Sequence, residues 1–234
     1  MNQGAQTATA PARDVQIRSG IVMLQGDLSI PAGAKGVVLF AHGSGSSRHS
    51  PRNQLVARRI REAGVGTLLF DLLTKEEEAI DTRTHHLRFD IGLLAQRLVD
   101  ATDWLKGDLS HLSVGFFGAS TGGGAALVAA AELGERVGAA VSRGGRPDLA
   151  GDALPQVKCP TLLIVGGFDY PVIQMNQEAF ARLRCEKELK IVSGATHLFE
   201  EPGTLEEVAR LAANWFQRHL RSAKASEGVQ GHSR

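Results

Sequence analysis

The feature that most constrains the fold is a glycine-rich turn between an apolar run and an alanine-rich run. Residues 114–126 read Val-Gly-Phe-Phe-Gly-Ala-Ser-Thr-Gly-Gly-Gly-Ala-Ala. The apolar run is typical of a buried strand and the alanine-rich run of a helix, so Ser120 is expected at the apex of a sharp strand-to-helix turn. Gly118 and Gly122 supply the small neighbours that so close a crossing needs. The pattern predicts a nucleophilic serine held in strained backbone.

Phosphate binding is the alternative interpretation of this turn. Under it, the glycines at 122–124 would form the start of a phosphate-binding helix. The segment has neither the Lys-Ser/Thr ending of a P-loop nor the G-x-G-x-x-G spacing of a dinucleotide site. The nucleophile is therefore the favoured interpretation, and phosphate binding stays as its alternative.

The rest of the chain alternates between strand-like and helix-like patterns. Strands are expected at residues 15–24, 25–31, 36–41, 66–71, 112–117, 137–142, 161–165 and 189–192, and helices at 53–63, 89–105, 123–133, 172–183 and 205–220. The first two strands alternate apolar and polar residues, as in an antiparallel hairpin at a sheet edge, whereas the later ones are continuously apolar. This order predicts an α/β fold with a mostly parallel twisted sheet of about eight strands and helices on both faces.

One folded domain over residues 15–220 is expected, because α/β domains of this size commonly stay single. Residues 1–14 and 221–234 are small and polar, so they are predicted to be a disordered leader and tail. The charged stretch 75–83 is expected to be a solvated excursion whose acidic run at 76–78 faces water. Between residues 142 and 159 there is room for one short helix, so no large lid domain is predicted.

Composition narrows the classes of partner. The formal charge of +1 is spread over 234 residues, which argues against nucleic acid or an anionic membrane as a partner. No apolar segment approaches the roughly 18 to 20 residues of a membrane span. Two cysteines without metal-ligand spacing, and no recognisable secretory signal, predict a cytoplasmic protein with buried structural thiols. Small molecules are the expected partners, and the chain is expected to be a monomer or a homodimer.

A serine hydroxyl needs a general base within hydrogen-bond reach and a third group that orients the base. His197 follows the last predicted strand in a loop of small residues and is the expected base. The later histidines fit less well, because His219 belongs to the polar side of the terminal helix and His232 to the tail.

Asp169 is the expected orienting acid. It follows the strand at 161–165 through Gly-Gly-Phe, which places a carboxylate at the same sheet edge as the serine and the histidine. The structural alternative is a helix cap before Pro171. Asp148 and Asp152, which follow the preceding strand, remain alternative acids.

Acyl transfer also needs donors for the oxyanion of the tetrahedral intermediate. The N–H of Thr121, directly after the nucleophile, is the first expected donor. The loop His-Gly-Ser-Gly-Ser-Ser at 42–47 is expected to supply the second through the N–H of Ser44, while His42 braces the loop.

Three arginines are candidates for holding a carboxylate or phosphate group of a substrate. Arg143 and Arg146 follow a strand that points at the same edge, and Arg48 follows the 42–47 loop. Ion pairing or carbonyl capping within a glycine-rich loop is the structural alternative, and it is favoured for them.

With these residues in the order Ser, Asp, His, the chain resembles the α/β-hydrolase superfamily, and within it the small lidless dienelactone hydrolase-like proteins. The likeness spans residues 15–220. It rests on Phe-Ala-His-Gly-Ser-Gly-Ser-Ser at 40–47, Gly-Ala-Ser-Thr-Gly at 118–122, Gly-Gly-Phe-Asp at 166–169 and Gly-Ala-Thr-His at 194–197.

This resemblance implies hydrolysis of small esters or lactones through an acyl-enzyme, without a metal or organic cofactor. Thioester, amide or carbon–carbon bond hydrolysis on the same triad, and a non-catalytic binding protein that retains the fold, are the alternatives. Authentic dienelactone hydrolases carry cysteine at the nucleophile where this chain has Ser120, so the resemblance does not extend to dienelactone itself as the substrate.

Overall fold

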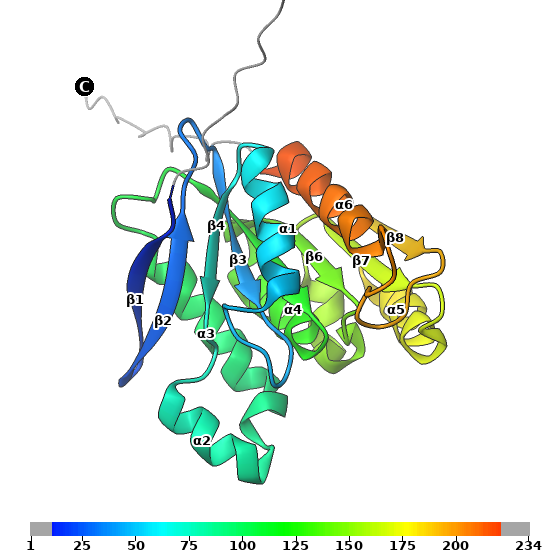
Figure 1. Cartoon of the computed structure of the whole chain (residues 1–234), viewed down its shortest axis with the longest axis horizontal. Helices are drawn as coiled ribbons and strands as arrows, with labels where there is room; N and C mark the ends of the chain where they lie inside the picture. The colour runs from blue at the N-terminus through cyan, green and yellow to red at the C-terminus, as the bar shows by residue number, and fades with distance from the viewer. Residues whose placement is uncertain (1–10, 221–234) are drawn as a thin grey trace, which may run out of the picture.

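An eight-stranded sheet with helices on both faces organises residues 11–220, the part of the chain that the computed structural model describes (Figure 1). The strand order is β1-β2-β4-β3-β5-β6-β7-β8. Strand β2 pairs antiparallel with β1 and β4, and every other neighbouring pair is parallel. The predicted α/β-hydrolase sheet with an antiparallel N-terminal edge is therefore confirmed.

The elements follow the expected alternation along the chain. Their bounds are β1 Arg13–Ser19, β2 Val22–Ser29, β3 Gly36–Ala41, α1 Pro51–Glu62, β4 Gly66–Phe70, α2 Lys75–Thr84, η1 Leu87–Phe89, α3 Ile91–Trp104, β5 Ser113–Ala119, α4 Thr121–Leu133, η2 Gly134–Arg136, β6 Val137–Arg143, η3 Pro147–Gln156, β7 Thr161–Gly166, α5 Tyr170–Arg182, β8 Lys187–Val192 and α6 Thr204–His219. Strand β1 begins two residues before the predicted domain start. The rest of the predicted leader, up to residue 10, and the tail from residue 221 lie outside the described residues.

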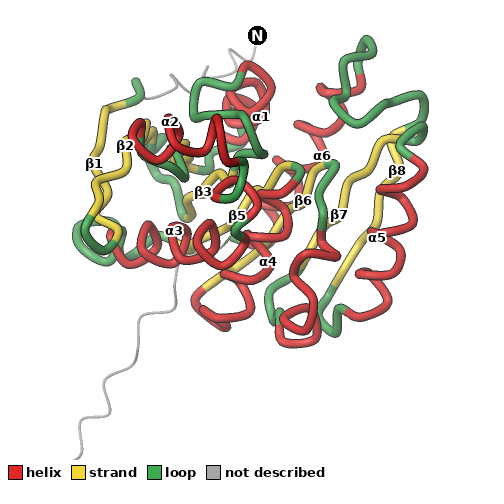
Figure 2. Tube along the Cα trace, turned by 90° about the horizontal axis from the view of Figure 1, so that it is seen from below, coloured by secondary structure: helices red, strands yellow, loops and turns green. Residues whose placement is uncertain are grey.

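A hydrophobic cluster fills each face of the sheet. Helices α3, α4 and α5 contribute to one cluster and α1 and α6 to the other, and Figure 2 shows these two layers of helices on opposite sides of the strands. The neighbouring residues Phe116 and Phe117 of β5 belong to different clusters, and both are fully buried. Because successive side chains of a strand point to opposite faces, a strand covered on both faces has to be continuously apolar.

The N-terminal hairpin turns earlier than expected. The sequence prediction divided the two strands between residues 24 and 25, whereas β1 ends at Ser19 and β2 begins at Val22. Gly20 occupies the turn with φ +56°, a left-handed conformation that glycine adopts without steric cost. The alternating pattern runs on through residues 22–24, and it concealed this break.

The charged stretch after β4 is a helix, α2, and not an irregular excursion. Thr74 caps it: its hydroxyl accepts from the N–H of Glu77, and the Glu77 carboxylate accepts from the N–H of Thr74. This reciprocal pair is a capping box. Glu76 and Glu78 are exposed as predicted, but Glu77 also pairs with the buried Arg97 at 2.7 Å, so the acidic run does not face water throughout.

The connection between β6 and β7 contains only η3, so no lid domain is inserted there. Within residues 11–220, no helix is both long and apolar enough to cross a membrane.

Helix α6 closes one face of the sheet through Phe216, and this contact predicts a large loss of stability on truncation. Phe216 is fully buried, and its ring fills the space that a side chain at Gly115 would need. Phe216→Ala is expected to lower the free energy of unfolding by about 3–5 kcal/mol, because the cavity cannot fully collapse. Asn214→Ala, on the exposed side of the same helix, is expected to change it by about 0.5 kcal/mol or less. Urea unfolding of both variants measures this, and equal midpoints would contradict the packing role.

Candidate active site

The ends of five neighbouring strands meet at one edge of the sheet. The pairs Ala41 with Gly118, Ala119 with Arg143, Arg143 with Ile164 and Gly166 with Val192 are in register there. The loops that leave these strands carry the predicted site residues. A common edge therefore receives the 42–47 loop, Ser120, Asp169 and His197, as expected for ligand sites in open α/β sheets.

Ser120 has the backbone that a strained nucleophile turn requires. Its φ is +52° and its ψ −123°, a conformation rarely adopted by residues other than glycine. Hydrogen bonds on both sides hold it: its N–H donates to the carbonyl of Arg143 at 3.3 Å, and its own carbonyl accepts from Gly123 and Arg146 at 2.9 and 3.0 Å. The surrounding structure thus fixes a backbone that the serine would not adopt alone.

The flanking glycines allow this turn because no side chain fits at either position. A Cβ atom at Gly118 would lie 2.6 Å from the Cα of Gly123. At Gly122 it would lie 2.7 Å from the carbonyl carbon of Ala41 and would collide with the carbonyl oxygen. These obstacles are backbone atoms, which cannot rotate away. Both glycines are therefore required for α4 to start so close to β3 and β5.

Asp169 and His197 are in direct contact. The Nδ1 atom of His197 lies 2.6 Å from Oδ2 of Asp169. An ionised carboxylate only accepts hydrogen bonds, so this contact favours the tautomer with the proton on Nδ1 and leaves Nε2 free to accept a proton. The Asp169 side chain is 12% exposed and that of His197 39%, so the acid is enclosed and the imidazole is accessible. This is the arrangement of a general base with its orienting group.

The two loops that carry this pair are fixed to each other. The N–H of Phe168 donates to the carbonyl of Ala195 at 2.9 Å. Glu201 accepts from both the N–H and the hydroxyl of Thr196, at 3.1 and 2.6 Å, and these bonds lower the pKa of Glu201. Sequence reasoning missed Glu201, although a Thr-x-x-x-x-Glu spacing beside the predicted base was visible.

Gly144 lies against the loop that carries His197. It follows Arg143, which receives the Ser120 N–H, and its own N–H donates to Ile164 at 2.7 Å. A side chain at Gly144 would come within 3.1 Å of the His197 carbonyl and 3.6 Å of Nδ1. Within residues 11–220 no hydrogen bond links Ser120 Oγ to His197; bonds between a nucleophile and its base are often long until substrate binds.

The two predicted oxyanion donors are neighbours, but one is already engaged. Thr121 is the first residue of α4, so its N–H has no carbonyl partner within the helix. The N–H of Ser44 donates to the Thr121 hydroxyl at 3.1 Å. This contact brings the 42–47 loop to the start of α4, and the Ser44 N–H becomes available to a ligand only when the hydroxyl rotates away.

His42 braces the loop, as expected. It is buried; its Nε2 accepts from the N–H of Leu72 at 3.0 Å, and its Nδ1 lies 3.0 Å from the Gly43 carbonyl. Burial lowers the pKa of His42, which keeps the ring neutral, as accepting at Nε2 requires.

Two of the three candidate arginines are held by the protein itself. Arg48 pairs with Asp71 and, at 3.4 Å, with Asp27. Arg146 forms a bidentate pair with Asp148 at 2.9 and 2.7 Å. The structural alternative thus describes both, and the geometry does not support a substrate-binding role for either of them.

The two alternative acids, Asp148 and Asp152, are both paired with arginines. Asp148 is occupied by Arg146, and Asp152 pairs with Arg182 while its side chain is fully exposed. Asp169 is therefore the carboxylate that meets His197. Of the other histidines, His219 lies on α6 against Trp215, and His232 lies outside the described residues.

Arg143 differs from the other two arginines. It is 7% exposed, and its Nε and Nη1 atoms are buried without a hydrogen-bond partner among residues 11–220. Burial, with the nearby charge of Arg52, lowers the pKa of Arg143 to about 10, so the side chain still carries its charge near neutral pH. Arg52 itself was not predicted, although it stands in the first turn of the helix that follows the 42–47 loop.

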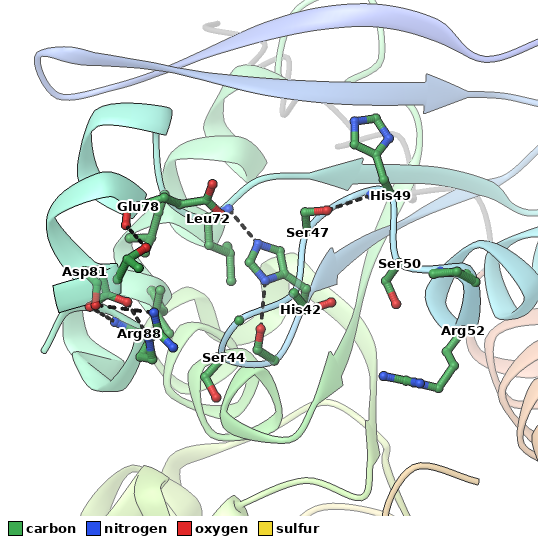
Figure 3. A pocket seen from close by; sticks show the side chains of 17 residues that line it. His42, Ser44, Ser47, His49, Ser50, Arg52, Leu72, Glu78, Asp81 and Arg88 are labelled. Atoms are coloured by element: carbon green, nitrogen blue, oxygen red, sulfur yellow. Dashed lines mark hydrogen bonds and ion pairs between the residues drawn. The ribbon is translucent and has the colours of Figure 1, made fainter. Parts of the chain in front are cut away.

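A cavity of about 640 Å³ adjoins the site (Figure 3). The 42–47 loop lines it on one side, Arg52 lies at one end, and Glu78, Asp81 and Arg88 from the α2–η1 segment lie opposite. Asp81 is buried and pairs with Arg88, which fastens α2 to η1. Ser120 and His197 do not line this cavity, so it reaches the nucleophile turn by way of Ser44.

The cysteines take no part in this arrangement. Cys159 and Cys185 are free thiols, the first buried and the second half-buried. Burial raises the pKa of Cys159 to about 12, which keeps the thiol protonated and unreactive. Among the described residues, no group of three or more histidine, cysteine, aspartate or glutamate side chains is placed to hold a metal ion.

Comparison with known proteins gives a consistent match. The dienelactone hydrolase family matches residues 24–225. A crystal structure of a dienelactone hydrolase from Anabaena variabilis is 63% identical, covers 92% of this chain and 100% of that one, and superposes with a TM-score of 0.90. The dienelactone hydrolase-like promiscuous phosphotriesterase P91 from metagenomic libraries shares the fold, with 19% identity, 91% and 100% coverage and a TM-score of 0.72.

A curated relative carries a different name. "Putative phosphoribosyl transferase Rv0571c" of Mycobacterium tuberculosis is 58% identical over 217 residues, which is 91% of this chain and 48% of the relative. The chain thus spans about half the length of that protein.

The glycine contacts at the nucleophile turn predict that the site tolerates no side chain at Gly122. Gly122→Ala is expected to lower the free energy of unfolding by about 3 kcal/mol, because the added methyl group meets backbone of β3. The control is Gly107→Ala, where a Cβ meets nothing within 4 Å, and there we expect a change of about 0.5 kcal/mol or less. Chemical denaturation measures both; a Gly122→Ala protein as stable as the control would show that α4 does not approach β3 so closely.

Proposed function

The chain belongs to the dienelactone hydrolase family, a family of hydrolases, and from this premise we propose that it hydrolyses small carboxylic esters or lactones through an acyl-enzyme on Ser120. The observation that carries the proposal is the 2.6 Å contact of His197 with Asp169 at the sheet edge where Ser120 occupies its strained turn. In this proposal the three residues form a serine hydrolase triad, and their order along the chain, which is that of α/β-hydrolases, supports it.

In the proposed acylation step, Ser120 Oγ attacks the carbonyl carbon of the ester. Nε2 of His197 takes the hydroxyl proton, and Asp169, bonded to Nδ1, stabilises the imidazolium that forms. The tetrahedral intermediate collapses as His197 returns the proton to the leaving alcohol. Ser120 then carries the acyl group as an ester.

Charge on the intermediate is stabilised by backbone donors in this proposal. The N–H of Thr121 at the start of α4 is the first donor, and the partial positive charge of the helix N-terminus supports it. The N–H of Ser44 is the second, once the Thr121 hydroxyl releases it. In the deacylation step His197 activates water, which attacks the acyl carbon and releases the acid.

Small esters are the favoured substrates because no large lid covers the site. Helix α2, with 10 residues, is the segment that overhangs the adjoining cavity, and no domain is inserted between β6 and β7. Thioester, amide and carbon–carbon bond hydrolysis use the same triad chemistry, and turnover of a substrate panel separates them from ester hydrolysis.

Phosphoribosyl transfer is not proposed for this chain. The name belongs to a relative of which the chain spans only about half. The glycines at 122–124, which sequence reasoning considered as a phosphate site, are packed against protein: Gly123 faces Gly145 and Ser142, and Gly124 faces the carbonyl of Arg146. These contacts give the glycines a packing role at the start of α4.

Removal of the nucleophile tests the proposal directly. Ser120→Ala is expected to lower kcat/KM for p-nitrophenyl acetate and butyrate by about a thousandfold or more, because no acyl-enzyme forms. Ser110→Ala, an exposed serine in the loop before β5, is the control and should match the wild type. Turnover that survives Ser120→Ala would remove Ser120 from the mechanism. A fluorophosphonate probe that fails to label folded wild type would favour a non-catalytic binding protein.

The orienting acid gives a second, independent prediction. Asp169→Asn is expected to lower kcat by about a thousandfold to ten-thousandfold, because asparagine no longer stabilises the protonated histidine. Asp152→Asn, at a fully exposed position paired with Arg182, should leave kcat unchanged. Stopped-flow or steady-state assays of both variants measure this. A larger loss in Asp148→Asn than in Asp169→Asn would transfer the role to the alternative acid.

A further inference from the structure

Strand β8 leaves one side of its backbone without a neighbouring strand. It is the last strand of the sheet, and within residues 11–220 it pairs with β7 alone (Figure 1). The carbonyl of Val192 accepts from the N–H of Gly167 at 2.8 Å, so the backbone of Val192 faces β7. Successive residues of a strand alternate in this direction. The residues whose N–H and C=O groups face outwards are therefore Lys187, Leu189 and Ile191.

An edge strand is usually protected by lysine side chains, whose charges repel a second strand. Strand β8 has two lysines, but the protein itself engages both charges. Nζ of Lys187 donates to the carbonyls of Phe180 and Leu183 at 2.7 and 2.6 Å, where α5 ends. Nζ of Lys190 lies 2.9 Å from the carboxylate of Glu188, two residues away on the same face of the strand. The usual protection of an edge is therefore weakened here.

The charges of β8 match a second copy of the same strand. If two copies pair antiparallel with Leu189 opposite Leu189, Glu188 of each copy lies opposite Lys190 of the other, with Cα atoms about 4.5 Å apart. A twofold axis at Glu188 or at Lys190 would instead place like charges opposite each other, which is destabilising. Arg218 of α6 lies 3.7 Å from Glu188 in an exposed pair, which rearranges at little cost. Charge complementarity thus favours one register.

The backbone and the apolar side chains fit the same register. With the axis at Leu189, the two copies of Leu189 exchange both backbone hydrogen bonds, and Lys187 of each copy does so with Ile191 of the other. The Leu189 side chain is half-buried against the hydrophobic cluster on the α5 face, whereas Ile191, on the same face, is 46% exposed. A second strand would remove apolar surface of both side chains from water.

We propose that the chain forms a homodimer in which β8 pairs antiparallel with β8 of a second copy, with the twofold axis at Leu189. The contact is isologous, because the same residues of both copies form it, and it joins the two eight-stranded sheets into one. The paired strands run in opposite directions, so the two carboxyl edges, with their candidate active sites, face opposite ways. The inference does not depend on the proposed esterase activity.

Sedimentation velocity of the wild type at about 1–200 µM tests the association. The mass should rise from that of one chain towards that of two over this range, as for a small and weak interface. Lys190→Glu and Glu188→Lys should each raise the Kd of the dimer by roughly tenfold or more, because each substitution places like charges opposite each other. Arg18→Glu makes the same charge change as Lys190→Glu at an exposed position on β1, the opposite edge of the sheet, and should keep the wild-type Kd.

A mixture of the two charge variants tests the register. When Glu188→Lys is mixed with Lys190→Glu, both lysines lie on one copy and both acids on the other, so opposite charges face each other again. The mixture should associate about as tightly as the wild type, although each variant alone is weakened. A mixture that stays as weak as its components would exclude the axis at Leu189.

A proline tests the backbone contribution separately from charge. Ile191→Pro removes an outward N–H that β7 does not use, and edge strands accept proline at such positions. At a concentration where the wild type is monomeric, its Tm should stay within about 4 °C of the wild-type value. Its Kd for dimer formation should rise by roughly tenfold or more. If this variant does not fold, the charge variants and their mixture decide.

A wild type that remains monomeric up to about 200 µM overturns the homodimer. Association that survives both Lys190→Glu and Ile191→Pro, or that is lost in Arg18→Glu, overturns β8 as the contact. Turnover of p-nitrophenyl esters takes no part in these measurements, so failure of the dimer and failure of the esterase are distinguishable.

Discussion

The close approach of α4 to strands β3 and β5 is the constraint on which the site depends. Gly118 and Gly122 allow the helix to begin where backbone atoms of Gly123 and Ala41 leave no space for a side chain. Ser120, between them, takes a positive φ as a consequence, and the carbonyl of Arg143 and the N–H groups of Gly123 and Arg146 hold it there. Strain of this kind persists only where the surroundings over-determine it.

The parallel pairing of the strands then determines which residues lie near Ser120. Because β5, β6, β7 and β8 end at one edge, the loops after them arrive together although up to about 80 residues separate them along the chain. The Asp169 and His197 loops are joined by backbone bonds, and Glu201 fastens the second of them. The side-chain contact at 2.6 Å is thus a product of sheet geometry more than of local sequence.

The alternation of strands and helices, and the site residues at the strand ends, could be predicted from sequence alone. Burial on both faces of a strand requires a continuous apolar run, and sharp turns require glycine, so both features are visible in the local sequence. Prediction failed where the deciding contact came from elsewhere in the chain. The hairpin was divided wrongly since alternation continues through its turn, and α2 was overlooked although Thr74 and Glu77 have capping-box spacing. Arg48 and Arg146 attracted attention as ligands, but Asp27, Asp71 and Asp148 neutralise them, and two of those partners are distant in sequence.

Arg143 shows why a burial pattern must be read together with charge. In sequence it is one of three arginines near the same edge, and the two with carboxylate partners are explained by the fold alone. The third is enclosed, and no carboxylate among the described residues pairs with it, so the fold gains no ion pair from it. Arg143 also supplies the carbonyl that accepts from the N–H of Ser120, so a charge that the described residues leave unpaired stands on the residue that holds the nucleophile turn, and natural proteins retain such a cost mainly at functional sites.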